Sequence, residues 1–263
     1  VSPYFPAKEW EEARRTLPED VFRQEYMAEF LEDSAGVFRG VDGCLIPEIG
    51  NSKLETDGNR RTVIVGCDIA KHTDWTVCIA MDARSGRCLE MERFNQLDWP
   101  LQRNRIAGFV RRWNGRLVMD ATGVGDPIYD DLRRVLPQVE GFKITAQTKR
   151  ELVQGLMVAV EQRRVMWPAD KGKSAISTKS ALGGEGNGNW EVLTAEMKRF
   201  EYELGPSGQV SYRAPSGYHD DCVIALALGV WGCGRFGVEP GRMMRLGPRC
   251  WSTFGRQRSL TLV

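Results

Sequence analysis

The chain has 263 residues, 42% of them hydrophobic, and its 36 Lys and Arg nearly balance its 35 Asp and Glu, for a formal charge of +1. A chain of this length can bury one sizeable core or two small ones. The balanced charge excludes binding of a polyanion through overall charge, so any nucleic-acid contact must use basic residues that are concentrated locally. No run of 18 or more apolar residues occurs, and residues 1–30 carry no secretory signal pattern. We therefore expect a soluble, intracellular protein with no membrane partner.

The seven cysteines are odd in number, show no CxxC spacing and lie mostly in apolar runs such as GCDIA and TVCIA. A disulfide framework or a zinc site would use paired spacings. We therefore expect reduced cysteines that serve as packing residues.

The first sixty residues are predicted to precede the main domain. A helix is expected over about 19–32, and a glycine-rich stretch follows to Asn59. The main domain is expected over 61–234. From residue 235 onward the chain carries six arginines against one glutamate, without clear periodicity. Residues 235–263 are therefore predicted to be a basic, flexible tail.

Three strand-like runs follow one another between residues 61 and 94, namely RTVIVGCDIA, WTVCIAMD and RCLEMERF. The segment ARSG supplies a tight turn between the last two. This pattern predicts an antiparallel meander.

Helices and strands then alternate, which is typical of an α/β domain. The expected order is a helix after Pro100, the buried strand RLVMD, a helix over about 127–136, the strand GFKITA and a helix over about 149–164. Residues 169–189 are predicted to form a functional or mobile loop. An amphipathic element over 190–204, the strand QVSYRA and the helix HDDCVIALALGVWG follow. This last helix is apolar nearly all round and is therefore expected to be buried.

Aspartates occur where apolar residues are expected. Asp68 lies inside the apolar run VIVGCDIA, where an ionised carboxylate is costly unless it is paired, hydrogen-bonded or metal-bound. Asp120 ends the strand RLVMD. Asp221, with Asp220 beside it, lies in the first turn of the buried helix and shares a helical face with apolar residues. Clustered aspartates are the ligands that Mg²⁺ and Mn²⁺ use together with water and substrate phosphates.

Each of these residues also has a purely structural interpretation. Asp220 or Asp221 can cap a helix, and Asp120 can be an ordinary turn residue. For Asp68 neither a cap nor a turn follows inside the strand. The conjunction of the three positions therefore favours a metal site. Asp74 is either an outer ligand or a hairpin-loop residue.

The chain has two histidines. His219, beside Asp220 and Asp221, is a candidate metal ligand or proton acceptor, and the alternative is a structural role at the start of the helix. His72 is expected to be a solvated loop residue.

Three familiar motifs are excluded. KGKS at 171–174 is not a P-loop, because Trp167 stands where that pattern requires glycine. GEGNG opens no βαβ unit, so it is not a dinucleotide fingerprint. No Gly-x-Ser-x-Gly elbow occurs, which disfavours an α/β-hydrolase. The sequence thus carries no recognisable ATPase motif.

The order of the elements, with aspartates on the first strand, on the strand after the meander and on the last helix, resembles the ribonuclease H-like fold. That fold is a mixed central sheet, three antiparallel strands followed by parallel strands, flanked by helices. The segments GCDIAKHTDWTV, VMDATGVGDPIYDDL and YHDDCVIALALG resemble the three nuclease motifs of tailed-phage terminase large subunits. The resemblance extends over about 61–231. FRQEYMAEFLEDSAGVFRG is similar to the segment that follows the packaging ATPase in these proteins, so 1–60 would be a linker or remnant after that ATPase.

The resemblance implies a divalent-metal-dependent endonuclease that cleaves double-stranded viral DNA concatemers during genome packaging by two-metal-ion hydrolysis. It implies that Asp68, Asp120 and Asp221 are the catalytic metal ligands, with Asp220 as a further ligand. Asp74 and His219 would support them. The implied cofactor is Mg²⁺ or Mn²⁺, with two ions when DNA is bound.

The implied partners are double-stranded DNA, the packaging ATPase domain, the portal and the small terminase subunit. The implied location is the host cytoplasm and, transiently, the procapsid portal. Basic residues that flank the long helix or follow it are candidates for DNA contacts: Lys149, Arg150, Arg163, Arg164, Lys171, Lys173 and Lys179. Lysines on a solvated surface are the alternative.

Two other functions remain open. One is another ribonuclease H-like nuclease, such as a junction resolvase or a transposase core. The other is a non-catalytic module that docks to the portal or to the ATPase.

Overall fold

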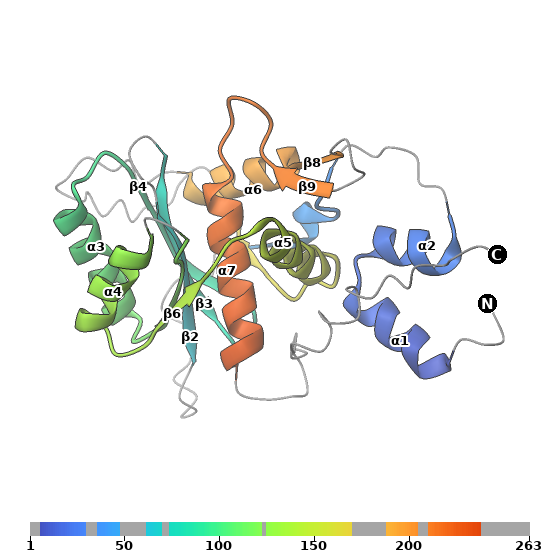
Figure 1. Cartoon of the computed structure of the whole chain (residues 1–263), viewed down its shortest axis with the longest axis horizontal. Helices are drawn as coiled ribbons and strands as arrows, with labels where there is room; N and C mark the ends of the chain where they lie inside the picture. Colours follow the sequence, from blue (N-terminus) through green and yellow to red (C-terminus); the bar gives the residue numbers. More distant parts are fainter. Residues whose placement is uncertain are drawn as a thin grey trace, which may run out of the picture.

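The computed structural model describes residues 6–29, 36–47, 62–69, 74–122, 125–169, 188–204 and 210–237. Its centre is a mixed five-stranded sheet (Figure 1). In spatial order the strands are β4 (Cys88–Phe94), β3 (Thr76–Asp82), β2 (Val63–Asp68), β5 (Arg116–Asp120) and β6 (Val139–Phe142). β4, β3 and β2 pair antiparallel, whereas β2, β5 and β6 pair parallel. The predicted meander followed by parallel strands is confirmed.

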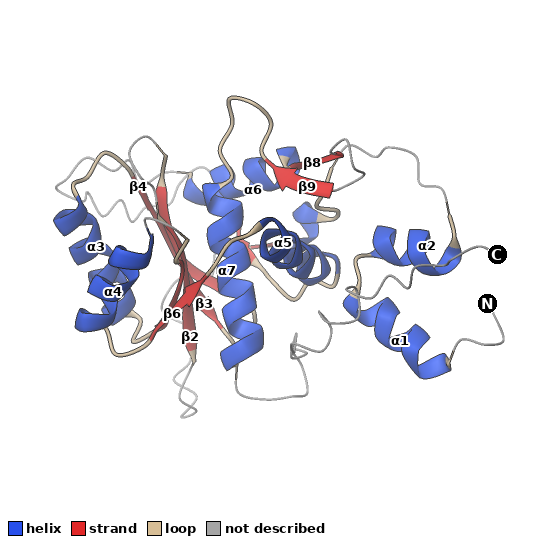
Figure 2. Ribbon diagram, in the orientation of Figure 1, coloured by secondary structure: helices blue, strands red, loops and turns tan. Residues whose placement is uncertain are grey.

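Helices cover both faces of this sheet (Figure 2). On one face lie α3 (Trp99–Arg112) and α4 (Gly125–Val135), and on the other lie α5 (Ala146–Glu161), α6 (Asn189–Arg199) and α7 (Asp221–Phe236). Along β2, Val65 and Cys67 pack toward α3, and Ile64 packs toward α7. Burial on both faces is the reason that these strands are continuous apolar runs.

α7 lies directly against β2 because Gly66 has no side chain. A Cβ at Gly66 would lie 2.1 Å from the carbonyl oxygen of Ala225 and 2.4 Å from the backbone nitrogen of Gly229. Only glycine permits so close an approach of two backbones. Further along the helix, a Cβ at Gly232 would lie 2.7 Å from the side chain of Ile64. α7 therefore runs antiparallel to β2, and its first residue lies at the carboxyl end of that strand.

Two N-terminal helices, α1 (Ala7–Thr16) and α2 (Glu19–Met27), lie on the far side of α5 from the sheet (Figure 1). The backbone N–H of Glu19 donates to Oε2 of Glu161 at 3.1 Å, which ties α2 to the end of α5. The segment after them enters the core through Val37, Phe38, Val41 and Cys44. These residues precede the predicted domain boundary at 61 and nevertheless contribute to the packing of the sheet domain.

Short strands complete the described part. β1 (Leu45–Ile46) pairs parallel with β7 (Trp167–Pro168), and β8 (Glu201–Leu204) pairs antiparallel with β9 (Val210–Arg213). The element predicted over 190–204 is therefore two elements, the helix α6 and the strand β8. Among the residues that the structure describes, no helix is long and apolar enough to cross a membrane.

Several predicted helix boundaries differ from the structure. The helix predicted over 19–32 ends at Met27, because Ala28 adopts a left-handed conformation with φ of 53°. α1 was not predicted at all. The helix predicted over 149–164 begins at Ala146, since Thr145 and Thr148 form a reciprocal capping box. It ends at Glu161, before Arg163, whose φ is 51°.

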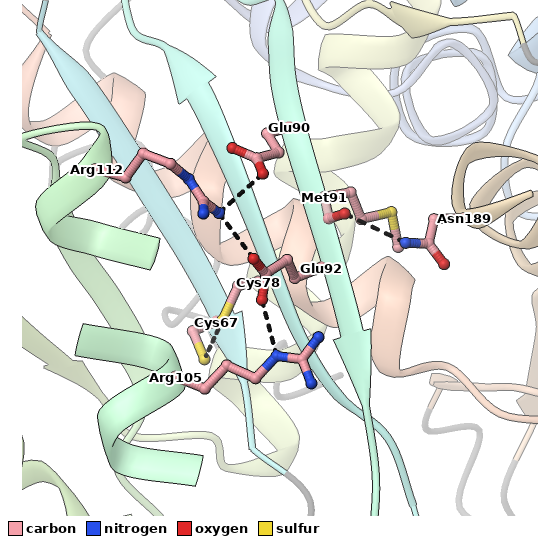
Figure 3. Close-up of polar contacts among 8 residues, drawn as sticks. All are labelled: Cys67, Cys78, Glu90, Met91, Glu92, Arg105, Arg112 and Asn189. Atoms are coloured by element: carbon pink, nitrogen blue, oxygen red, sulfur yellow. Dashed lines mark hydrogen bonds and ion pairs between the residues drawn. The ribbon is translucent and has the colours of Figure 1, made fainter. Parts of the chain in front are cut away.

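Ion pairs join α3 to the edge strand β4 (Figure 3). Arg112 contacts both Glu90 and Glu92, at 2.8 and 2.7 Å, and Arg105 contacts Glu92 at 3.0 Å. The same figure shows Cys67 and Cys78, which face each other across β2 and β3 with their sulfurs 3.4 Å apart. All six cysteines that the structure describes are free and buried, which confirms that they pack in the core.

Candidate metal centre

The fold brings three predicted aspartates to one end of the sheet. Asp68 is the last residue of β2 and Asp120 is the last residue of β5. These two strands are parallel neighbours, and Cys67 pairs with Met119, so the two aspartates follow paired residues. Asp221 is the first residue of α7, which begins at the carboxyl end of β2. Strand pairing and the glycine contact therefore bring positions 68, 120 and 221 to the same end of the sheet.

The carboxylates repel one another across this end of the sheet. Burial raises the pKa of the Asp68 carboxyl well above its ordinary value. The negative charges of Asp221, Asp120 and Asp220 raise it further. A bound divalent cation would relieve this repulsion, and carboxylate oxygens are the ligands that such hard cations prefer. Among the residues that the structure describes, no three His, Cys, Asp or Glu side chains lie close enough together to hold a metal ion as they stand. The fit of the aspartates to a cation therefore rests on their charge and on their oxygen donors.

Asp120 is oriented by Thr122. Oδ1 of Asp120 accepts hydrogen bonds from the Thr122 backbone N–H at 2.9 Å and from its hydroxyl at 2.5 Å. The same hydroxyl accepts the N–H of Ile144 at 2.6 Å, just beyond β6. Thr122 therefore anchors Asp120 to the neighbouring strand.

Asp221 is held by groups from both sides. Its Oδ2 accepts the backbone N–H of Trp75 at 3.1 Å. The Nδ1 of His219 lies 3.7 Å from that oxygen and 3.6 Å from Oδ1 of Asp74. Burial raises the pKa of the Asp221 carboxyl, while the hydrogen bond from Trp75 and the charge of His219 lower it. The two supporting residues predicted from the sequence, Asp74 and His219, thus lie beside Asp221.

Asp220 has a different environment, although it is adjacent in the chain. Its Oδ2 lies 3.0 Å from Nζ of Lys149, near the start of α5. Both side chains of this pair are about one quarter exposed, at 28% and 27%. Lys149 thus neutralises Asp220, so this carboxylate is less available to a cation than Asp221.

A family model described as "Terminase RNaseH-like domain" matches residues 65–230. The chain belongs to this family. It is 30% identical over 233 residues to the terminase large subunit of Thermus virus P23-45, and equally to that of Thermus phage G20c. The match covers 84% of this chain and 43% of each relative, so the chain spans less than half of the relatives' length. The predicted resemblance to phage terminase large subunits is confirmed.

Solved structures support the same terminase fold. The crystal structure of the large terminase nuclease from thermophilic phage G20c with bound magnesium aligns with a TM-score of 0.59 at 23% sequence identity. The alignment covers 76% of this chain and 98% of that chain. A structure of the same nuclease with bound cobalt gives a TM-score of 0.59. The predicted ribonuclease H-like fold is confirmed.

The basic residues predicted to contact DNA are spread over this terminase domain. Arg163 and Arg164 lie just beyond the end of α5, about 20 Å along the helix axis from Lys149. The Arg163 side chain contacts Gly43, and burial lowers the pKa of Arg164. Arg150 lies near Tyr212; burial raises the pKa of the Tyr212 hydroxyl, and the charge of Arg150 partly offsets that shift. His72, Lys171, Lys173, Lys179 and the tail beyond residue 237 lie outside the described residues.

Two residues that contact the candidate site were not predicted from the sequence. Thr122 was available from a local signal, since a threonine two residues after an aspartate at a strand end can close an Asx-type turn. Trp75 contributes through its backbone N–H, to a carboxylate 146 positions away. No local pattern could have shown that contact.

Proposed function

We propose that this terminase domain is a divalent-metal-dependent endonuclease that cleaves double-stranded viral DNA concatemers during genome packaging. The observation that supports the proposal is the position of Asp68, Asp120 and Asp221 at one end of the sheet, where burial and the neighbouring carboxylates raise the pKa of Asp68. Crystal structures of related terminase nucleases contain magnesium or cobalt. We extend this property to the present chain as part of the proposal.

In the proposed reaction, Asp68, Asp120 and Asp221 hold Mg²⁺ or Mn²⁺, with two ions present when DNA is bound. The ions would supply Lewis-acid activation of water and stabilisation of the leaving oxygen in an in-line displacement. Thr122 keeps Asp120 in place, and Trp75 keeps Asp221 in place through its backbone N–H. His219, 3.7 Å from Asp221, is positioned to hold or accept a proton at Nδ1.

Cleavage of supercoiled plasmid in Mg²⁺, in Mn²⁺ and in chelator tests this function. We expect the chain to nick and linearise the plasmid only with metal. Asp68→Asn and Asp120→Asn should abolish cutting while the circular dichroism spectrum stays unchanged. Asp130→Asn is the matched control, because Asp130 is exposed on α4. Retained Mn²⁺-dependent cutting by either active-site variant would contradict the proposal.

A non-catalytic docking module is the competing function, and it makes a different prediction about metal. Aspartates with a purely structural role have no reason to bind Mn²⁺ in the micromolar to millimolar range. Calorimetric titration of the chain with Mn²⁺ therefore separates the two. A branched-DNA substrate separates the terminase activity from a junction resolvase, which would cut branched DNA in preference to plain duplex.

The packaging context is likewise a proposal, because the chain spans 43% of the length of its relatives. A packaging ATPase domain, the portal and the small terminase subunit are the proposed partners. We also propose that the host cytoplasm and the procapsid portal are the places where the domain acts.

A further inference from the structure

Glu196 on α6 contacts the first turn of α7, beside Asp221. Its Oε2 accepts the backbone N–H of Cys222 at 2.9 Å, and its Oε1 lies 3.1 Å from the Cys222 sulfur. The residue at the usual capping position of α7, Asp220, makes no side-chain capping bond. The start of α7 is therefore capped by a carboxylate that comes from another helix. A negative group at this position is also stabilised by the helix dipole.

The same turn is held from a second side through Arg93 on β4. The Arg93 guanidinium carbon lies 4.4 Å from the centre of the Trp75 ring, and the backbone N–H of Trp75 donates to Asp221. Burial raises the pKa of the Glu196 carboxyl, whereas the hydrogen bonds from Cys222 and the positive charge of Arg93 lower it. Arg93 therefore lies against Trp75 and carries a charge that favours the ionised form of Glu196.

This restraint opposes a specific force. The charges of Asp74 and Asp220 act on the Asp221 carboxylate, and the charge of Asp221 acts on Asp68. Repulsion of this kind would push the first turn of α7 away from the sheet. Both Glu196 oxygens contact Cys222, so this carboxylate is directed at the start of α7.

We infer that Glu196 is a positioning residue that holds the first turn of α7 so that Asp221 faces Asp68, with Arg93 fixing both Glu196 and Trp75. The inference rests on the proposed function, because it assigns Glu196 a purpose only if Asp221 binds a cation. Some residues orient a metal ligand without touching the metal. Their removal commonly lowers metal affinity by about 10 to 100-fold.

Calorimetric titration of the full 263-residue chain with Mn²⁺ tests the inference. Glu196→Ala should weaken Mn²⁺ binding by about tenfold or more. Glu196→Gln keeps an oxygen that can accept the Cys222 N–H, so it should recover part of the affinity. Arg93→Met should weaken binding in the same direction. Glu191→Ala, on the exposed first turn of α6, is the matched control and should bind as the wild type does.

The melting temperature of each variant is measured in chelator in parallel, so that effects on stability and on metal affinity are separated. If Glu196→Ala fails to fold, Glu196→Gln and Arg93→Met decide the question. Wild-type affinity in the Glu196 variants, whatever their melting temperatures, would overturn the inference and leave the proposed function standing. A wild-type chain that binds no Mn²⁺ would overturn both. Weakened binding by Asp68→Asn together with normal binding by Glu196→Ala would overturn the inference alone.

Discussion

Lys149 and Asp220 form an ion pair, with Nζ 3.0 Å from Oδ2, whereas the adjacent Asp221 accepts the backbone N–H of Trp75. Two neighbouring aspartates thus have different electrostatic partners. This difference separates their expected contributions to a metal site.

We predict that Asp221→Asn weakens Mn²⁺ binding far more than Asp220→Asn does. The first variant removes a proposed ligand that forms no ion pair with a lysine or arginine in the described residues, and we expect a loss on the order of 100-fold. The second removes a charge that Lys149 already neutralises, so we expect a loss of less than about tenfold. Calorimetric titration of both variants measures the difference. Equal losses would show that both aspartates bind the ion directly.

Thr122 is predicted to control metal affinity through Asp120. Thr122→Val preserves the shape of the side chain but removes the hydroxyl that donates to Asp120 and accepts from Ile144. We expect Mn²⁺ affinity to fall about tenfold. Thr122→Ser retains the hydroxyl and should remain close to the wild type. If the valine and serine variants bind alike, the hydroxyl does not orient Asp120.

Asp68→Asn is predicted to stabilise the metal-free protein at neutral and alkaline pH. The pKa of Asp68 is raised in the folded state, so the folded protein favours the protonated form more than the unfolded chain does. The contribution of this group to stability is therefore present at low pH and is lost as the pH rises through the folded pKa. Asparagine carries no charge and avoids that loss.

We expect the free energy of unfolding of Asp68→Asn to exceed that of the wild type by at least about 1 kcal/mol at about pH 8 in chelator. The difference should shrink as the pH falls, because the wild-type carboxyl becomes protonated. Denaturant unfolding across the pH range measures it. Asp130→Asn, on an exposed position of α4, should change stability by less than about 0.5 kcal/mol. If Asp68→Asn is less stable than the wild type at every pH, other groups in the fold stabilise the ionised Asp68 carboxylate.

Gly66→Ala is predicted to displace α7. The added Cβ would lie 2.1 Å from the Ala225 carbonyl oxygen, and backbone cannot move aside as a flexible side chain can. We expect a loss of stability of about 2–3 kcal/mol and a loss of Mn²⁺ affinity, because Asp221 moves with the helix. Gly108→Ala, within α3, is the control.

A Cβ at Gly108 meets no atom within 4 Å. The control should therefore be neutral or more stable by about 0.5–1 kcal/mol, since alanine favours a helix. Denaturant unfolding and calorimetry of both variants check the prediction. Wild-type stability in Gly66→Ala would show that α7 can move away from β2 without lowering the free energy of unfolding.

The sheet was predictable because its strands are apolar runs separated by short turn signals. Asp68 stood out for the same reason, since a carboxylate inside such a run has no ordinary structural explanation. α1 was missed because its sequence, AKEWEEARRT, is dominated by charged residues and its apolar side is short, with Trp10 and Ala13. Its position depends instead on contacts with α2, such as the one between Trp10 and Phe22.

Asp74 and His219 were predicted from their sequence positions, but other contacts at the candidate site could not be derived from local patterns. The choice between Asp220 and Asp221 depends on Lys149, which lies 71 positions away from its partner. Glu196 is 26 positions from Cys222, and its position relative to α7 is set by the packing of two helices. Sequence spacing identifies residues that are unusual for their element, but only the fold shows which charges meet.

α7 is the last of the described elements, and it supplies Asp221. During synthesis, Asp120 leaves the ribosome about 100 residues before Asp221, an interval of roughly 5–20 s, and Asp68 leaves it earlier still. Until α7 docks, the apolar face of the sheet that it covers remains open, and the third carboxylate is missing. Docking of α7 would therefore complete both the core and the proposed cutting site. A chain that is still being synthesised would not cut DNA.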